Sequence, residues 1–260
     1  MIPTRAAAEN WSDLLQHPAA GDHLVQVYRD DDFLGDAVAE YIRTGLRSGD
    51  AVILIATPLH RAAFLRRLDQ DAGKALRRGQ LRVMDAQETL AAFTPGGMPD
   101  WHTFHLLIGG LIAELRLQYP HVRAYGEMVD VLWQRGQRDA ALRLEEFWND
   151  LTRLQTFSLL CTYYMDVLDG AAYAGPLECV CQVHTHLIPH RDYRVFNDAV
   201  NAASEKVLEQ PLAGMLLSLA AHNKTATDMP QGQATLLWLK RNMPRTAEKV
   251  LAEVRSRLES

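Results

Sequence analysis

A single carboxylate, Glu127, interrupts a largely apolar stretch of the chain. The stretch AYGEMVDVLW begins at Ala124, and the acidic side chain stands where a strand-like run gives way to a helix-like one. A buried charge without a partner is strongly disfavoured, so the carboxylate must lie at the end of an element or be bonded. We expect Glu127 to accept hydrogen bonds from a ligand or to pair with a buried base; an ion pair with Arg123 or another arginine is the structural alternative.

Histidines and aromatic residues near the ends of the expected strands are the other candidates for a binding site. His60 opens the helix that follows the second strand, where it could face a ligand. His23 begins the first strand, where a structural contact that holds the strand in place is the simpler role. Trp133 either packs in the core or lines a pocket. The predicted ligand-binding residues are Glu127, His60, Tyr28, Trp133, Tyr163 and His23.

Two cysteines and two histidines stand close together in the stretch CVCQVHTH, namely Cys179, Cys181, His184 and His186. These residue types bind zinc, but structural zinc sites usually separate paired cysteines by roughly two to four residues. On a continuous strand the cysteines would share one face and the histidines the other. The spacing therefore favours buried small residues and polar histidines, and a metal site formed by these residues is the weaker alternative.

The motifs of several enzyme classes are missing from the sequence. The strand-like run AVILIAT is followed by PLHRAAF, which lacks the glycine, lysine and Ser/Thr positions of a phosphate-binding loop. No GxGxxG motif opens a helix, and neither GxSxG nor HExxH occurs. We therefore predict a protein with no catalytic residue and no cofactor. An enzyme in which Glu127 and His60 act as an acid–base pair is one alternative.

The alternation of strand-like and helix-like patterns predicts the fold. Apolar, β-branched runs alternate with segments whose apolar residues recur at helical spacing. This order predicts an α/β fold of three layers, with a mostly parallel sheet and helices on both faces. In such sheets functional groups gather beyond the carboxyl ends of the strands, where Glu127 and His60 are expected. The expected strands are residues 23–29, 51–57, 81–86, 121–128 and 157–166.

The last part of the chain has the pattern of helices. We expect an N-terminal helical segment at 1–22, an α/β domain at 23–190 and a helical extension at 191–260. The apolar residues of the extension either pack on the domain as a cap or form a surface for a second copy or a partner, and we favour the interaction. These residues are Leu236, Leu237, Leu239, Val250, Leu251, Val254 and Leu258.

Composition and charge disfavour several classes of protein. The 260 residues carry a net charge of -5, whereas general nucleic-acid binders have a basic surface. Three cysteines are an odd number and too few for a disulfide framework. The first residues lack the apolar core of a secretory signal, and no apolar stretch is long enough to span a membrane. We expect a cytoplasmic protein that contacts neither membranes nor nucleic acid directly.

Six segments in a fixed order resemble one known family. They are HLVQVYRDDDFL, YIRTGLRSGDAVILIATPLH, GQLRVMDAQETLAAF, VRAYGEMVDVLWQRG, LEEFWNDL and FSLLCTYY. Their order and spacing resemble the MEDS sensory domain, named for methanogen, methylotroph and DcmR sensors, over roughly residues 20 to 190. The resemblance implies a core related to KaiC and RecA that has lost its phosphate-binding loop and senses small molecules such as hydrocarbon derivatives. Such domains stand beside histidine kinase modules or a helix-turn-helix, and neither is recognisable in this sequence.

The residues and the resemblance together predict a non-enzymatic cytoplasmic sensory protein. It would bind a small, largely apolar organic ligand or a partner protein, and relay binding through its C-terminal helices to a regulatory partner. A histidine kinase or a regulator is the expected signalling partner, and a homodimer through the C-terminal helices is a further expectation. A pure protein–protein adaptor is the remaining alternative to the acid–base enzyme.

Overall fold

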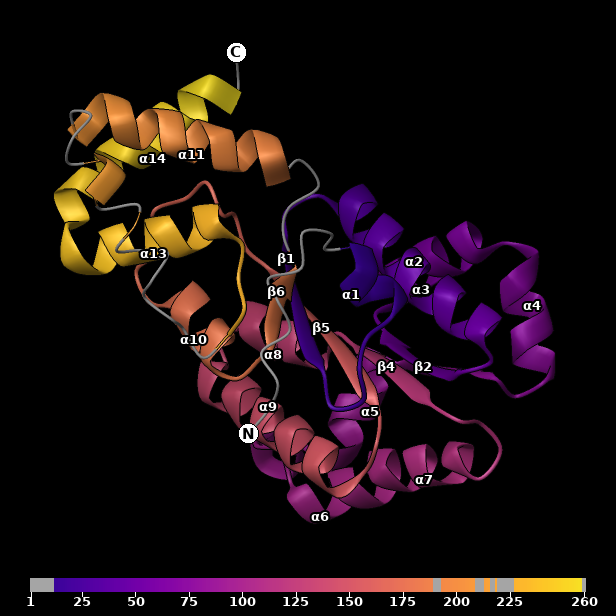
Figure 1. Cartoon of the computed structure of the whole chain (residues 1–260). Coiled ribbons are helices and arrows are strands. Elements are labelled where there is room, and N and C mark those ends of the chain that lie inside the picture. Colours follow the sequence, from indigo (N-terminus) through magenta and orange to yellow (C-terminus); the bar gives the residue numbers. More distant parts are fainter. Residues whose placement is uncertain (1–11, 189–192, 209–212, 216–217, 219–226, 259–260) are drawn as a thin grey trace. The chain divides into compact units, whose positions relative to one another are not determined.

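The computed structural model contains a parallel β-sheet (Figure 1). It describes residues 12–188, 193–208, 213–215, 218 and 227–258. Its six strands lie in the order β3-β2-β4-β5-β1-β6, and all run parallel. The five predicted strands are present, and a short sixth strand follows them along the chain. The strands are β1 His23–Tyr28, β2 Ala51–Ala56, β3 Leu81–Asp85, β4 Val122–Gly126, β5 Ser158–Tyr164 and β6 His186–Ile188.

Helices cover both faces of the sheet, which confirms the predicted three-layer α/β architecture. Helices α2 (Asp31–Ser48) and α3 (Pro58–Leu68) lie on one side of β2 and β4, and helices α5 (Ala86–Phe93) and α7 (Gly110–Arg116) lie on the other (Figure 1). All six residues of β2 are buried, because both of its faces are covered. No helix within the described ranges combines the length and the apolar character that crossing a bilayer requires. The helices are α1 Ser12–Gln16, α2 Asp31–Ser48, α3 Pro58–Leu68, α4 Gln70–Arg77, α5 Ala86–Phe93, η1 Pro95–Gly97, α6 Trp101–Phe104, η2 His105–Gly109, α7 Gly110–Arg116, α8 Met128–Gln134, α9 Arg138–Leu154, α10 Pro176–Gln182, α11 Tyr193–Leu208, α13 Gln231–Asn242 and α14 Pro244–Leu258.

Strands β2 and β4 are neighbours at a topological switch point. The chain leaves β2 through α3 and α4 to reach β3 on one side, whereas it leaves β4 through α8 and α9 to reach β5 on the other. Ile55 of β2 lies opposite Gly126 of β4, so the two strands end together. Ligands of open α/β sheets bind at the carboxyl ends of such strands, because the connections diverge there. The residues that follow β2 and β4 are therefore the first place to look for a site.

The chain divides into two compact units. The first comprises Met1–Gln26 and Asp30–Tyr164, and the second comprises Val27–Arg29 and Met165–Ser260. The units therefore meet in the sequence just after β5, earlier than the boundary expected at residue 190. The sequence pattern follows secondary structure, whereas the compact units follow which elements pack together.

The buried guanidinium of Arg123 links α1 to the sheet within the first unit. Arg123 on β4 donates from Nε to Oδ2 of Asp50 at 2.8 Å, and both residues are buried. The guanidinium also donates to the carbonyl oxygens of Leu15 and Gln16 in α1. Residues 1–11 of the predicted N-terminal helical segment lie outside the described residues. Arg123 forms its ion pair with the carboxylate of Asp50. The expected alternative of an ion pair between Arg123 and Glu127 is therefore wrong.

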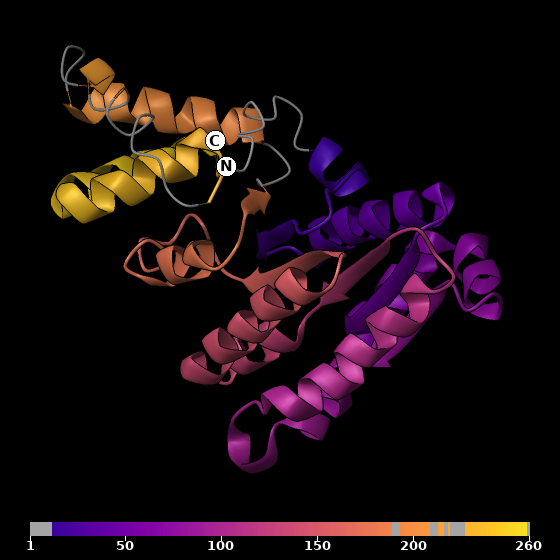
Figure 2. The ribbon, with the colours of Figure 1, turned by 60° about the horizontal axis from the view of Figure 1, so that its bottom comes forward.

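Three helices of the second unit, α11, α13 and α14, pack against one another, and α11 and α14 lie side by side (Figure 2). This packing contradicts the expectation that the apolar residues of the extension offer an exposed surface. Leu258 is partly exposed, and residues 209–212 and 219–226 of the extension lie outside the described residues. The other predicted surface residues are buried, namely Leu236, Leu237, Leu239, Val250, Leu251 and Val254.

Candidate functional site

His60 and Glu127 meet at the carboxyl edge of β2 and β4. Nδ1 of His60 lies 2.7 Å from Oε1 of Glu127, and the hydroxyl of Tyr125 donates to the same oxygen at 2.8 Å. The second carboxylate oxygen, Oε2, accepts the backbone N–H of Thr57 at 2.7 Å. Glu127 is only 2% exposed, and these bonds offset the cost of burying its charge. The two residues that the sequence placed at this edge are thus in direct contact.

The backbone at the two strand ends explains this geometry. The N–H of Glu127 donates to the carbonyl of Ile55 at 3.0 Å, so the ladder between β2 and β4 continues one residue past β4. Thr57 precedes α3, whose first residue is Pro58, and its side chain makes no capping bond. Phosphate-binding loops present backbone N–H groups to a ligand at such a place. In this chain the N–H of Thr57 donates instead to the carboxylate of Glu127.

His60 is held toward its protonated form. Burial by itself lowers the pKa of His60, but the hydrogen bonds and negative charges of Glu127 and Asp31 outweigh it, so the pKa is raised above 6.5. Oδ1 of Asp31, the first residue of α2, lies 3.6 Å from Nε2 of the ring. The side chain of His60 is 12% exposed, against 2% for Glu127. His60 is therefore the more exposed member of the pair, and Glu127 orients it.

Aromatic rings form an apolar backing for His60. The ring of Phe64 stacks on the imidazole, with 5.5 Å between centroids and 27° between planes. Tyr125 meets Phe64 edge-on at 5.4 Å. An imidazole that is oriented by a carboxylate and backed by apolar rings can donate a hydrogen bond to a small molecule whose remaining surface is apolar.

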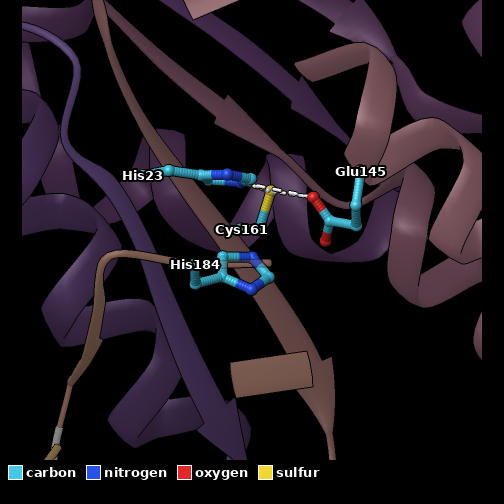
Figure 3. A group of neighbouring side chains, drawn as sticks. All are labelled: His23, Glu145, Cys161 and His184. Carbon is cyan, nitrogen blue, oxygen red and sulfur yellow. Dashed lines mark hydrogen bonds and ion pairs between the residues drawn. The ribbon is translucent and has the colours of Figure 1, made fainter. Parts of the chain in front are cut away.

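A second polar cluster lies inside the first unit, at His23, Glu145 and Cys161 (Figure 3). Nε2 of His23 lies 3.2 Å from Oε2 of Glu145 and 3.4 Å from Sγ of Cys161. Nδ1 of His23 lies 3.0 Å from Oδ1 of Asn149, and the hydroxyl of Tyr163 donates to Oε1 of Glu145 at 2.7 Å. His23 is 1% exposed, and Glu145 and Cys161 are fully buried. This cluster shares no residue with the His60–Glu127 pair.

Burial controls the protonation of this second cluster. It raises the pKa of the Cys161 thiol well above 9.0, and the neighbouring carboxylate of Glu145 raises it further. Burial and Glu145 also raise the pKa of Tyr163 well above 10.0, so its hydroxyl keeps the proton that it donates. The ring of Trp133 meets Tyr163 edge-on at 5.3 Å. Three predicted binding residues, His23, Tyr163 and Trp133, are thus connected through this cluster.

Tyr28, the remaining residue of the predicted ligand-binding set, belongs to the second unit. Its side chain is 3% exposed, and its carbonyl oxygen accepts the N–H of Met165 at 2.8 Å. This main-chain bond joins the end of β1 to the residue that follows β5. The role of Tyr28 in ligand binding stays a prediction.

The four residues of the weaker metal alternative also lie in the second unit. Cys179 and Cys181 stand on α10 instead of a strand, His184 follows that helix, and His186 begins β6. Nδ1 of His184, which Figure 3 also draws, lies 2.6 Å from the carbonyl oxygen of Val180. Burial raises the pKa of Cys181 to about 12. Among the residues that the structure describes, these four side chains do not together form a group with metal-ligand spacing.

Three residues of the buried cluster, Glu145, Asn149 and Cys161, were not predicted as site residues from the sequence. A signal was present, since Glu145 stands four residues after Ala141 and three before Trp148, both buried on α9. That spacing puts its carboxylate on the apolar face of the helix. A charged residue on such a face needs a buried partner, but the helix pattern does not say which residue supplies it.

The fold and the polar groups at the edge of the sheet define the class of this protein. The chain contains a doubly wound parallel α/β domain with polar groups at the carboxyl edge of its sheet, and a largely helical second unit. A family model described as the methanogen/methylotroph, DcmR sensory domain (MEDS) matches residues 22–185. The chain therefore belongs to the MEDS family of sensory domains, as the six segments predicted. No curated protein and no solved structure matches it.

Proposed function

We propose that this chain is a non-enzymatic sensory protein that binds a small organic molecule beside His60. The observation that carries the proposal is the contact between a partly exposed imidazole and a buried carboxylate at the β2/β4 switch point. Membership of a sensory family supports the same function. The position is the one at which open α/β sheets bind their ligands.

The bonding of Glu127 defines the kind of ligand. Both of its oxygens already accept hydrogen bonds from within the chain, so Glu127 acts through His60 and not on the ligand directly. A ligand acceptor would share the Nε2–H of His60 with Asp31, whose Oδ1 lies 3.6 Å from that nitrogen, next to the stacked ring of Phe64. We infer a short organic molecule with one hydrogen-bond acceptor, such as a carbonyl or hydroxyl oxygen, and an apolar remainder.

We propose that the second unit transmits ligand binding to a signalling partner protein. Helices α11, α13 and α14 form a packed helical group, which could present a surface to a signalling partner protein. A ligand shifts the population of two states only through a difference in affinity, and a few kcal/mol is enough. Binding at His60 would therefore bias the state in which the partner protein is recognised.

A thermal-shift screen of the full chain against short alcohols, aldehydes, ketones and carboxylic acids tests this function. A binding compound at about 100 times its Kd should stabilise the protein by about 2.7 kcal/mol. His60→Gln should abolish the shift and Glu127→Gln should reduce it, whereas His102→Gln, on the exposed part of α6, should leave it intact.

Two outcomes would overturn the proposal. If a compound stabilises His60→Gln as strongly as the wild-type protein, the site lies elsewhere. If a bound compound is converted to product by the wild-type protein and not by Glu127→Gln, the pair is catalytic, and the acid–base alternative replaces the sensor.

A further inference from the structure

We propose that His23, Glu145 and Cys161 are the ligands of a divalent transition-metal ion of the zinc type. The three residues come from β1, α9 and β5 and lie in the interior of the first unit (Figure 3). Imidazole nitrogen, carboxylate oxygen and thiolate sulfur are the three donor types that zinc uses in proteins. This metal site would be independent of the ligand site at His60.

The distances between the donor atoms fit a single ion. Nε2 of His23, Oε2 of Glu145 and Sγ of Cys161 are separated by 3.2, 3.4 and 3.8 Å. Bonds of about 2.0–2.3 Å in a tetrahedral arrangement separate such donor atoms by about 3.3–3.6 Å. An ion placed between the three atoms would therefore reach all of them with small adjustments of the side chains.

The charges also fit a divalent ion. A neutral imidazole, a carboxylate and a thiolate carry two negative charges, which an ion of charge +2 balances inside the protein. The ion binds the thiolate form of cysteine, so the thiol proton of Cys161 would leave to solvent when the ion binds.

The groups around the three ligands have the arrangement of a metal site's outer shell. Oδ1 of Asn149 lies 3.0 Å from Nδ1 of His23, which places a proton on Nδ1 and makes Nε2 the nitrogen that would bind the ion. The hydroxyl of Tyr163 donates to Oε1 of Glu145, and Oε2 is the oxygen that faces His23 and Cys161. Metal-ligating histidines and carboxylates are usually oriented by such hydrogen bonds. Three protein ligands leave a further coordination position for water or another donor.

Cobalt binding to the full, metal-free chain tests the proposal, because tetrahedral Co²⁺ is coloured and a thiolate ligand adds a charge-transfer band in the near ultraviolet. We expect one Co²⁺ per chain with that band, and its displacement by Zn²⁺. Cys161→Ser should abolish the band. The double variant Cys179→Ser, Cys181→Ser should retain it, and so should His60→Gln, which separates this site from the proposed ligand site.

Asn149→Ala keeps all three ligands and provides a second test if Cys161→Ser fails to fold. It should weaken Zn²⁺ affinity about 10–100-fold, the usual effect of losing an outer-shell hydrogen bond. The proposal is overturned if the wild-type chain binds no Co²⁺, if the charge-transfer band survives in Cys161→Ser, or if Asn149→Ala binds Zn²⁺ as tightly as the wild type. In each of these cases the contact between His23 and Glu145 accounts for the cluster without an ion.

Discussion

His60 and Glu127 stand 67 residues apart in the sequence, and their side chains are joined by a hydrogen bond of 2.7 Å. The bond forms because each residue follows one of two neighbouring parallel strands that end at the same level. Glu127 is buried and fully engaged within the chain, so it positions the imidazole. The consequences of this relationship can be measured without knowing the ligand.

The stability of the protein should depend on pH through His60. Its pKa is raised above 6.5 by Glu127 and Asp31, despite burial, which acts in the opposite direction. A basic group with a raised pKa stabilises the folded state fully below its unfolded pKa, and this contribution is lost as pH rises through the folded pKa. The free energy of unfolding should therefore decrease from about pH 6.5 upward because of this group.

Glu127→Gln should lower the pKa of His60 and reduce that decrease. Denaturant unfolding at a series of pH values measures the stability, and the NMR titration of the His60 ring measures the pKa. His102→Gln should leave both unchanged. A pKa of His60 that stays raised in Glu127→Gln would show that the carboxylate is not its main partner.

Arg123→Ala should cost about 3–5 kcal/mol, because it leaves the buried carboxylate of Asp50 without its partner. Urea unfolding followed by circular dichroism measures the loss. Arg82→Ala is the matched control, since Arg82 is 40% exposed and pairs with the exposed Glu114. We expect that change to cost about 0–1 kcal/mol. Equal losses in the two variants would contradict the anchoring role of Arg123.

Tyr163→Phe should destabilise the metal-free protein by about 1–3 kcal/mol, because the buried Oε1 of Glu145 loses its donor. Tyr164→Phe, at a neighbouring position that is 50% exposed, should change the stability by no more than about 0.5 kcal/mol. Differential scanning calorimetry of both variants gives the comparison. An unaltered stability of Tyr163→Phe would mean that this hydroxyl does not hold Glu145.

Leu251→Ala should destabilise the helical group of the second unit by about 2–5 kcal/mol, because Leu251 of α14 is buried. Lys249→Ala, on the exposed side of the same helix, should stay within about 0.5 kcal/mol of the wild type. Hydrogen exchange of the amides in α11, α13 and α14 locates the effect. If Leu251→Ala left the stability unchanged but altered the oligomeric state, the result would support the interaction surface expected from the sequence.

Much of the architecture could be predicted because its signals are local. The buried run of β2, the glutamate that follows β4 and the histidine that opens α3 each have a recognisable neighbourhood in the sequence. The rule that parallel strands share a carboxyl edge then brings His60 and Glu127 into one region. The helical extension was recognised for the same reason, but whether its apolar faces are covered depends on packing, and that part of the prediction was wrong for the buried leucines and valines.

The sequence by itself determined the order of strands and helices, the absence of a phosphate-binding-loop motif and the membership of a sensory family. Only the tertiary structure decided the partners of each polar group: Asp50 for Arg123, His60 for Glu127, and Glu145 for His23. The physical reason is that helical and strand periodicity arises from neighbours a few residues apart. A contact such as that between His23 and Cys161, 138 residues apart, depends on the order of the strands in the sheet and on the side chains that fill the space between them.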